Sequence, residues 1–281
     1  MPIYDRGYRK HEGRSPLQRL RFWPITREGL RLVIERRALL ALFGLSLLPF
    51  VVRAVQLYVV TRFPEAARIA PVDGRLFGEF LNQQIVFALL LSVFGGAGLV
   101  AQDLGSGAIL VYLSRPLTRR DYVLGKLGVV GGLNLGVTLV PALLLYGLGL
   151  SLTPDTFFRA DRAWIGPAIV AQSLILSTTL GLLALAVSSM ARSARAGGLA
   201  FFGLVASLEV ARRVLALLQG RPEVHLLSIQ QDLRMVGGML FGLSRGGPDL
   251  HPAYPWLALL ATCGLCLLVL RARIRAVNVV G

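Results

Sequence analysis

The sequence predicts an all-α polytopic membrane protein with six transmembrane helices. Of its 281 residues, 54% are hydrophobic and only 16% are charged, whereas a soluble domain carries about a quarter charged residues. The apolar residues form long runs, as a hydrocarbon core about 30 Å thick requires of helices that rise 1.5 Å per residue. A transmembrane barrel would show short segments of alternating polarity instead.

The first segment, residues 1–37, is predicted to be a cytoplasmic basic tail that ends in an amphipathic interface helix. From Pro24 onward, basic residues share one helical face and apolar residues share another, with Thr26 as the expected cap. A basic amphipathic helix beside a span typically lies in the membrane surface. The alternative is a solvated basic tail.

Residues 38–281 are predicted to form one transmembrane domain with six spans. These spans are expected at about residues 38–60, 83–101, 127–152, 163–190, 196–218 and 253–270. Pro49 is expected to kink the first span. The fifth span contains Glu209, Arg212 and Arg213, so it is either short or continues as a polar helix. Before the sixth span, residues 224–243 have the periodicity of one or two helices, which we place on the external side.

The distribution of charge predicts the orientation. The chain has 30 basic and 15 acidic residues, and with both termini inside, the inner segments carry roughly twice as many basic residues as the outer ones. Both termini are therefore expected in the cytoplasm. The chain is expected to lie, with multiple passes, in a bacterial cytoplasmic (inner) membrane.

Several polar residues lie in or beside the predicted spans and are candidates for lining a pathway. They are Arg53, Gln56, Gln83, Gln84, Gln172 and Glu209. The alternative is that helix packing satisfies them, or that Arg53 extends to the membrane surface. Gly128, Gly132 and Gly136 recur every four residues in the third span, which predicts close helix packing on that face.

The segment between the second and third spans is too polar to cross a membrane and too apolar for a plain linker. Gly105 and Gly107 interrupt the preceding helix, Pro116 forces a turn, and Thr118 can cap a new helix that starts at Arg119. This pattern predicts a short helix parallel to the membrane, with a basic corner, that docks on another protein. The alternative is an ordinary inner loop.

This segment resembles the cytoplasmic loop of type-2 ABC exporter permeases. The likeness rests on Asp103 and Gly107, on the run Leu113-Ser114-Arg115-Pro116-Leu117-Thr118-Arg119, and on Gly125-Lys126. The six-span layout is similar too, although Ala108 stands where the family often has Thr. The resemblance implies a coupling helix seated on an ATPase subunit. Its docking residues would be Asp103, Gly107, Ile109, Tyr112, Leu113, Ser114, Arg115, Pro116, Arg119 and Arg120.

The resemblance also implies the partners: two copies of a cytoplasmic ABC ATPase subunit and a second permease subunit, the same or homologous. Membrane lipids are expected around the chain, and nucleic acid is not. The chain would couple ATP hydrolysis by the ATPase subunit to export of a substrate, whose identity the sequence does not indicate.

Motifs for chemistry are absent from the sequence. No phosphate-cradling G-x-x-x-x-G-K-[ST] motif occurs, so ATP and Mg are expected on the partner and no cofactor on this chain. Cys263 and Cys266 lie in an apolar run, where thiolates are disfavoured, and no metal or catalytic constellation is evident. The expectation is a transporter subunit that is not itself an enzyme. The alternatives are a membrane scaffold that recruits a partner without transport and a lipid-handling membrane enzyme.

Overall fold

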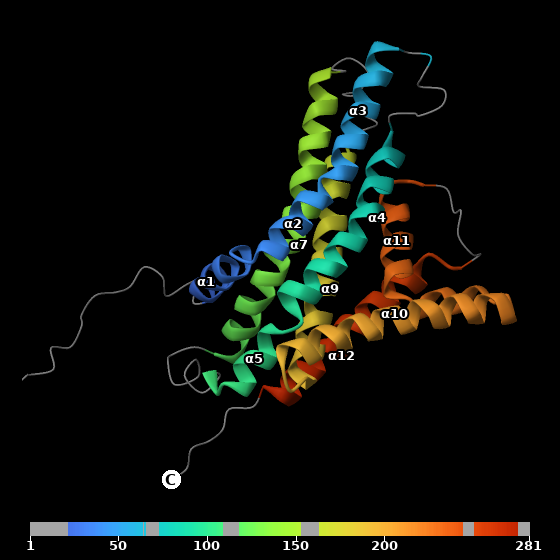
Figure 1. The fold of residues 1–281 in the computed structure, drawn as a ribbon. Helices are drawn as coiled ribbons and strands as arrows, with labels where there is room; N and C mark the ends of the chain where they lie inside the picture. Colours follow the sequence, from blue (N-terminus) through green and yellow to red (C-terminus); the bar gives the residue numbers. More distant parts are fainter. Residues whose placement is uncertain are drawn as a thin grey trace, which may run out of the picture.

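The computed structural model describes residues 22–63, 65, 73–108, 118–152, 163–243 and 250–274. Every regular element in these ranges is a helix, which confirms the predicted all-α class (Figure 1). Five helical stretches in this part of the chain are long and apolar enough to cross a membrane. They are Arg37–Arg62, Gly74–Gly105, Arg119–Leu152, Ile165–Met190 and Ala253–Arg273.

The first of these stretches is two helices, α2 (Arg37–Ser46) and α3 (Leu48–Arg62). They meet at Leu47, where Pro49 occupies the first turn of α3. A proline is tolerated there because the first turn of a helix leaves its backbone N–H groups without partners. The helix is thus interrupted next to Pro49, where the kink was expected.

The second stretch combines α4 (Gly74–Leu91), a π-helical turn η3 (Ser92–Gly96) and α5 (Leu99–Gly105). It begins well before the predicted start near residue 83. Asp73 caps α4, since its side chain accepts a hydrogen bond from the backbone two residues on. The prediction missed this start because the first turns of α4 are rich in glycine and charge.

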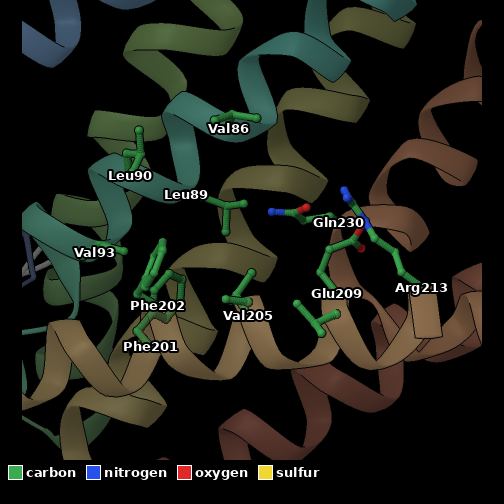
Figure 2. Close-up of a pocket in the computed structure, with 12 residues that line it drawn as sticks. Val86, Leu89, Leu90, Val93, Phe201, Phe202, Val205, Glu209, Arg213 and Gln230 are labelled. Atoms are coloured by element: carbon green, nitrogen blue, oxygen red, sulfur yellow. The ribbon is translucent and has the colours of Figure 1, made fainter. Parts of the chain in front are cut away.

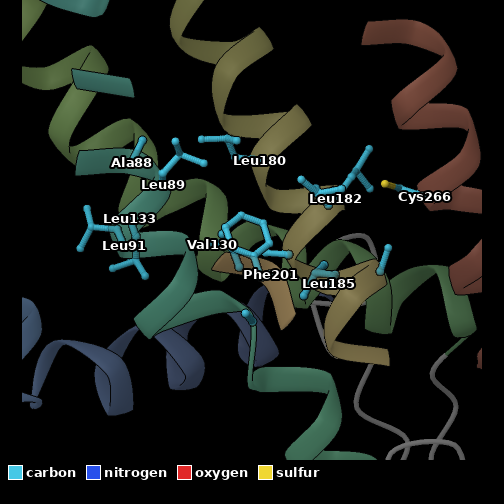
Figure 3. Close-up of a cluster of buried hydrophobic side chains, with 14 of the residues drawn as sticks. Ala88, Leu89, Leu91, Val130, Leu133, Leu180, Leu182, Leu185, Phe201 and Cys266 are labelled. Carbon is cyan, nitrogen blue, oxygen red and sulfur yellow. The ribbon is translucent and has the colours of Figure 1, made fainter. Parts of the chain in front are cut away.

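Helices α7 (Arg119–Leu152) and α9 (Ile165–Met190) pack side by side at the centre of the bundle. Between them and α4 lies a core of buried apolar side chains, with contributions from α10 and α12 (Figure 3). Among these residues are Ala88, Leu91, Val130, Leu133, Leu180 and Phe201.

Helix α1 (Trp23–Ile34) lies against the first half of α7. Thr26 is inside this helix and is not its cap: its hydroxyl donates to the carbonyl of Gly125 at 3.0 Å. The glycine stripe of α7 faces α1 and α2, and a methyl group added to Gly128 would lie 2.6 Å from the Thr26 hydroxyl. Glycine therefore permits this close approach.

Of the remaining helices, α10 lies across the lower part of the bundle in Figure 1, and α11 stands upright beside α4. Helix α10 (Ala194–Gln219) runs crosswise to α7 and α9, and it is not among the five candidate spans. After it come η5 (Pro222–Leu227), α11 (Ile229–Leu240) and α12 (Ala253–Arg273). The helices predicted within residues 224–243 are thus present.

Candidate functional site

The start of α7 is fixed by a reciprocal cap between Thr118 and Asp121. The backbone N–H and the hydroxyl of Thr118 both donate to Asp121 Oδ2, at 2.9 and 2.8 Å. In return the backbone N–H of Asp121 donates to Thr118 Oγ1 at 3.2 Å. This arrangement satisfies N–H groups that the first turn leaves without helical partners. The predicted cap at Thr118 is confirmed.

About two turns farther along α7, Lys126 joins the end of α5 through an ion pair. Its Nζ lies 2.7 Å from Asp103 Oδ2, and the two side chains are only 9% and 14% exposed. Tyr122 donates its hydroxyl hydrogen to the same carboxylate oxygen at 2.8 Å. We name Asp103, Tyr122 and Lys126 the clamp. Because all three groups are largely removed from water, losing one of them would leave a poorly compensated charge.

Helix α5 is also held from the side of α9. The Ser188 hydroxyl accepts hydrogen bonds from the backbone N–H groups of Val100 and Ala101, at 3.1 and 3.0 Å. Immediately before α5, the π-helical turn contributes Ser92, which accepts from Asn134 Nδ2 at 3.1 Å. A side chain thus supplies a cap that the sequence of α5 lacks, and α5 is bound to both central helices.

Residues 109–117 connect α5 to α7. The clamp joins these two helices directly, because Asp103 precedes the connecting residues and Tyr122 and Lys126 follow them. Gly107 has φ +69, a conformation that glycine adopts without steric penalty. Arg119 and Arg120 are exposed at the start of α7. The other predicted docking residues lie outside the described residues: Ile109, Tyr112, Leu113, Ser114, Arg115 and Pro116.

Sequence reasoning assigned Asp103 to partner docking and gave Tyr122 no role. The structure places both inside the clamp. The sequence did hold a signal for the ion pair: an isolated acid, Asp103, and an isolated base, Lys126, on the two sides of one loop, each next to an apolar helix. It was missed because the pairing depends on where α5 ends.

The candidate pathway residues make contacts with different elements. Arg53 donates to Gln56 Oε1 at 2.9 Å and to Glu79 Oε2 at 3.1 Å, linking α3 to α4. Gln84 is buried and donates to the carbonyl of Ser46 at 2.8 Å. The structure therefore does not gather these residues in one channel within the single chain.

The last three candidates are similarly dispersed. Gln83 is exposed on α4. Gln172 on α9 is buried and donates to the carbonyl of Leu233 on α11 at 2.9 Å. Glu209 accepts from Arg212 at 2.7 Å, from Arg213 at 2.8 Å and from the Ser228 hydroxyl at 2.7 Å.

The Glu209 cluster borders a largely apolar cavity of about 300 Å³ between α4 and α10 (Figure 2). Glu209, Arg213 and Gln230 lie together at one end in that view, and Phe202 lies toward the other. An adjoining cavity of about 630 Å³ shares Phe202 and extends along α10 to Arg195. The two cavities provide apolar space with charged groups at its ends.

Two titratable groups near α11 have displaced pKa values. Burial raises the pKa of Asp232 to about 8, and its Oδ1 has no hydrogen-bond partner in the described part of the chain. Burial, together with the neighbouring Arg212 guanidinium, lowers the pKa of His225. Within the described ranges no group of His, Cys, Asp and Glu is arranged to hold a metal ion.

The fold and this site define a polytopic helical membrane protein in which a largely buried clamp joins α5 to α7. Residues 34–270 match the family described as ABC-2 family transporter protein. The chain belongs to this family, whose members are membrane permease components of ABC transporters. No curated protein matches the sequence.

Proposed function

We propose that this chain is the membrane-spanning permease subunit of an ATP-driven ABC exporter. Two copies of a cytoplasmic ATPase subunit bind ATP and Mg, and a second permease subunit, the same or homologous, completes the assembly. Both termini face the cytoplasm of a bacterial cell, and the protein lies in the inner membrane. The family membership supports the permease role, and the asymmetry of basic residues supports the orientation.

The clamp is the observation that carries the coupling part of this proposal. A segment that docks on an ATPase transmits motion only if both of its ends are attached to helices that move with it. The pair between Asp103 and Lys126 joins α5 to α7 beside residues 109–117, and Ser188 attaches α5 to α9. A push on that segment would therefore reach the two central helices together.

The docking part is tested by reversing one charge. The tagged chain is purified from its own membranes, and a copurifying subunit with a phosphate-cradling motif is identified by mass spectrometry. Arg115→Glu is expected to remove that subunit. Arg192→Glu, the same change at an exposed position after α9, is expected to retain it. Unchanged copurification and ATP turnover in Arg115→Glu would refute the docking role.

The coupling part needs a variant that leaves docking intact. Lys126→Met removes the ammonium group from the clamp and keeps the length of the side chain. The ATPase is expected to copurify as before, but with lower ATP turnover in the complex. Normal turnover in a folded Lys126→Met protein would show that the clamp is structural only.

A membrane scaffold that recruits a partner without transport is the second candidate, because it would use the same clamped segment. In that case the copurifying protein would lack a nucleotide-binding motif. The two proposals therefore give opposite results in the same copurification.

A further inference from the structure

A groove of about 770 Å³ lies between the first turns of α7 and the last turns of α12. Its rim carries three guanidinium groups, those of Arg119, Arg120 and Arg271. Its floor is apolar and includes Leu124 and Leu267. The volume falls within the range of small-molecule sites, about 300–1,000 Å³.

Both walls place charge at the rim and apolar groups one helical turn deeper. On α7, Leu124 follows Arg120 by four residues, and on α12, Leu267 precedes Arg271 by four residues, so in each pair the side chains share a helix face. The groove continues to Gly264, about 10 Å along α12 from Arg271 at 1.5 Å per residue. It therefore runs from the end of a candidate span toward the middle of that span.

The three arginines have no ion-pair or hydrogen-bond partner within the described ranges, and all three are exposed. The nearest acid on α7, Asp121, is engaged by Thr118. Arg119 and Arg120 also occupy the first turn of a helix, where the macrodipole disfavours cations. Positive charge is thus concentrated at this rim, and no ion pair in the described part of the chain neutralises these three guanidinium groups, which favours an external anion.

We infer that this groove binds an anionic phospholipid, with its phosphate among Arg119, Arg120 and Arg271 and an acyl chain along the floor. Basic pockets between membrane helices are suited to anionic headgroups. A free phosphate would leave the apolar floor unused, and a cytoplasmic protein would not reach Leu267 and Gly264 inside the span. This inference goes beyond the proposed transport function, and it requires no ATPase.

The binding of the lipid phosphate by the three arginines is tested with the purified full chain in a neutral detergent, without ATPase. Native mass spectrometry compares the binding of phosphatidylglycerol and phosphatidylcholine. Each of Arg119→Gln, Arg120→Gln and Arg271→Gln is expected to weaken phosphatidylglycerol binding about fivefold. Arg273→Gln removes a charge that is also exposed and lies in the same last turn of α12 but outside the groove, and it is expected to change little.

The binding of an acyl chain along the floor of the groove is tested by a substitution at Gly264. A Cβ atom added there would meet nothing within 4 Å, so the helix backbone at Gly264 accepts a side chain, and Gly264→Leu is expected to occupy part of the groove. This variant is expected to bind phosphatidylglycerol more weakly. The binding of inorganic phosphate to Gly264→Leu, measured in the same way, is expected to match that of the parent chain.

Several outcomes would overturn the inference. Equal binding of the two lipids, or unchanged phosphatidylglycerol binding in the arginine variants, would show that the rim does not bind a headgroup. Full competition by inorganic phosphate, with no effect of Gly264→Leu, would indicate a site for free anions. If Arg119→Gln and Arg120→Gln leave lipid binding unchanged and lose the ATPase in the copurification described under the proposed function, these two arginines contact the partner instead. The control is the Arg→Lys change at each of the three positions. If these variants retain lipid binding and elute as the parent does, misfolding is excluded as the cause of weaker binding in the Gln variants.

Discussion

Helix α9 and the α2–α3 stretch are both apolar enough to cross a membrane, yet they occupy opposite environments. The most apolar window of α9 is 72% buried inside the chain, whereas that of α2–α3 is 11% buried. Helix α9 contacts α7, α12, α10 and α4. Along α2 and α3, side chains such as Leu40 and Val52 remain exposed, at 52% and 64%.

The difference teaches that apolarity alone does not separate a central membrane helix from a peripheral one. In lipid, helices associate through close packing and hydrogen bonds rather than through the hydrophobic effect. Helix α9 has the residues that such packing needs: Gly181 approaches Leu127, and the Ser177 hydroxyl donates to the carbonyl of Gly131 at 3.1 Å. The exposed apolar face of α2–α3 is suited to contact with lipid or with another apolar helix.

The largest effect is expected from a cavity in the buried region. Leu180 on α9 is fully buried, so Leu180→Ala should lower the free energy of unfolding by about 2–5 kcal/mol. Leu40→Ala, the same change on exposed α2, should shift it by no more than about 0.5 kcal/mol. Thermal unfolding of both variants in one detergent measures the contrast. Equal losses at the two sites would show that α2 is covered as fully as α9.

The sequence predicted the α7, α9 and α12 helices well because each is a long apolar run with clear ends, such as the Thr118 cap. The early part of α4 was not predicted because Arg75 and Glu79 lower its mean hydropathy, although Glu79 pairs with Arg53 at 3.1 Å.

The clamp was not predicted for a different reason. Its three residues meet only through the fold, and no periodicity in the sequence reports which side chains meet.

A buried acid gives an effect of comparable size, but one that depends on pH. Asp232 on α11, which packs against α9, is only 2% exposed, and burial raises its pKa to about 8. The folded state thus holds the proton more tightly than the unfolded state does. The protonated Asp232 carboxyl therefore makes its full contribution to the free energy of unfolding below about pH 4. This contribution is lost as the pH rises toward 8, at about 1.4 kcal/mol per pH unit.

Asp232→Asn is expected to remove that slope, so the variant should gain stability over the parent as the pH rises from 4 to 8. Melting temperatures of the two proteins across this range measure the gain. Asp73→Asn is the matched control, because Asp73 is not buried and asparagine caps a helix equally well. Parallel curves for Asp232→Asn and the parent would mean that Asp232 is already ionised in the folded protein.

The smallest effect is expected from an ion pair on the exposed surface. Arg31 and Glu35 on and after α1 are 3.5 Å apart, with side chains 74% and 64% exposed, in contrast to the largely buried pair in the clamp. Water and salt screen such a pair, so Glu35→Gln should change the free energy of unfolding by less than about 0.5 kcal/mol. Melting at low and high salt measures this change, and the small effect should vanish at high salt. A loss as large as that of Leu180→Ala would place Glu35 in a buried contact, and the contrast between covered and uncovered regions would then fail at α1.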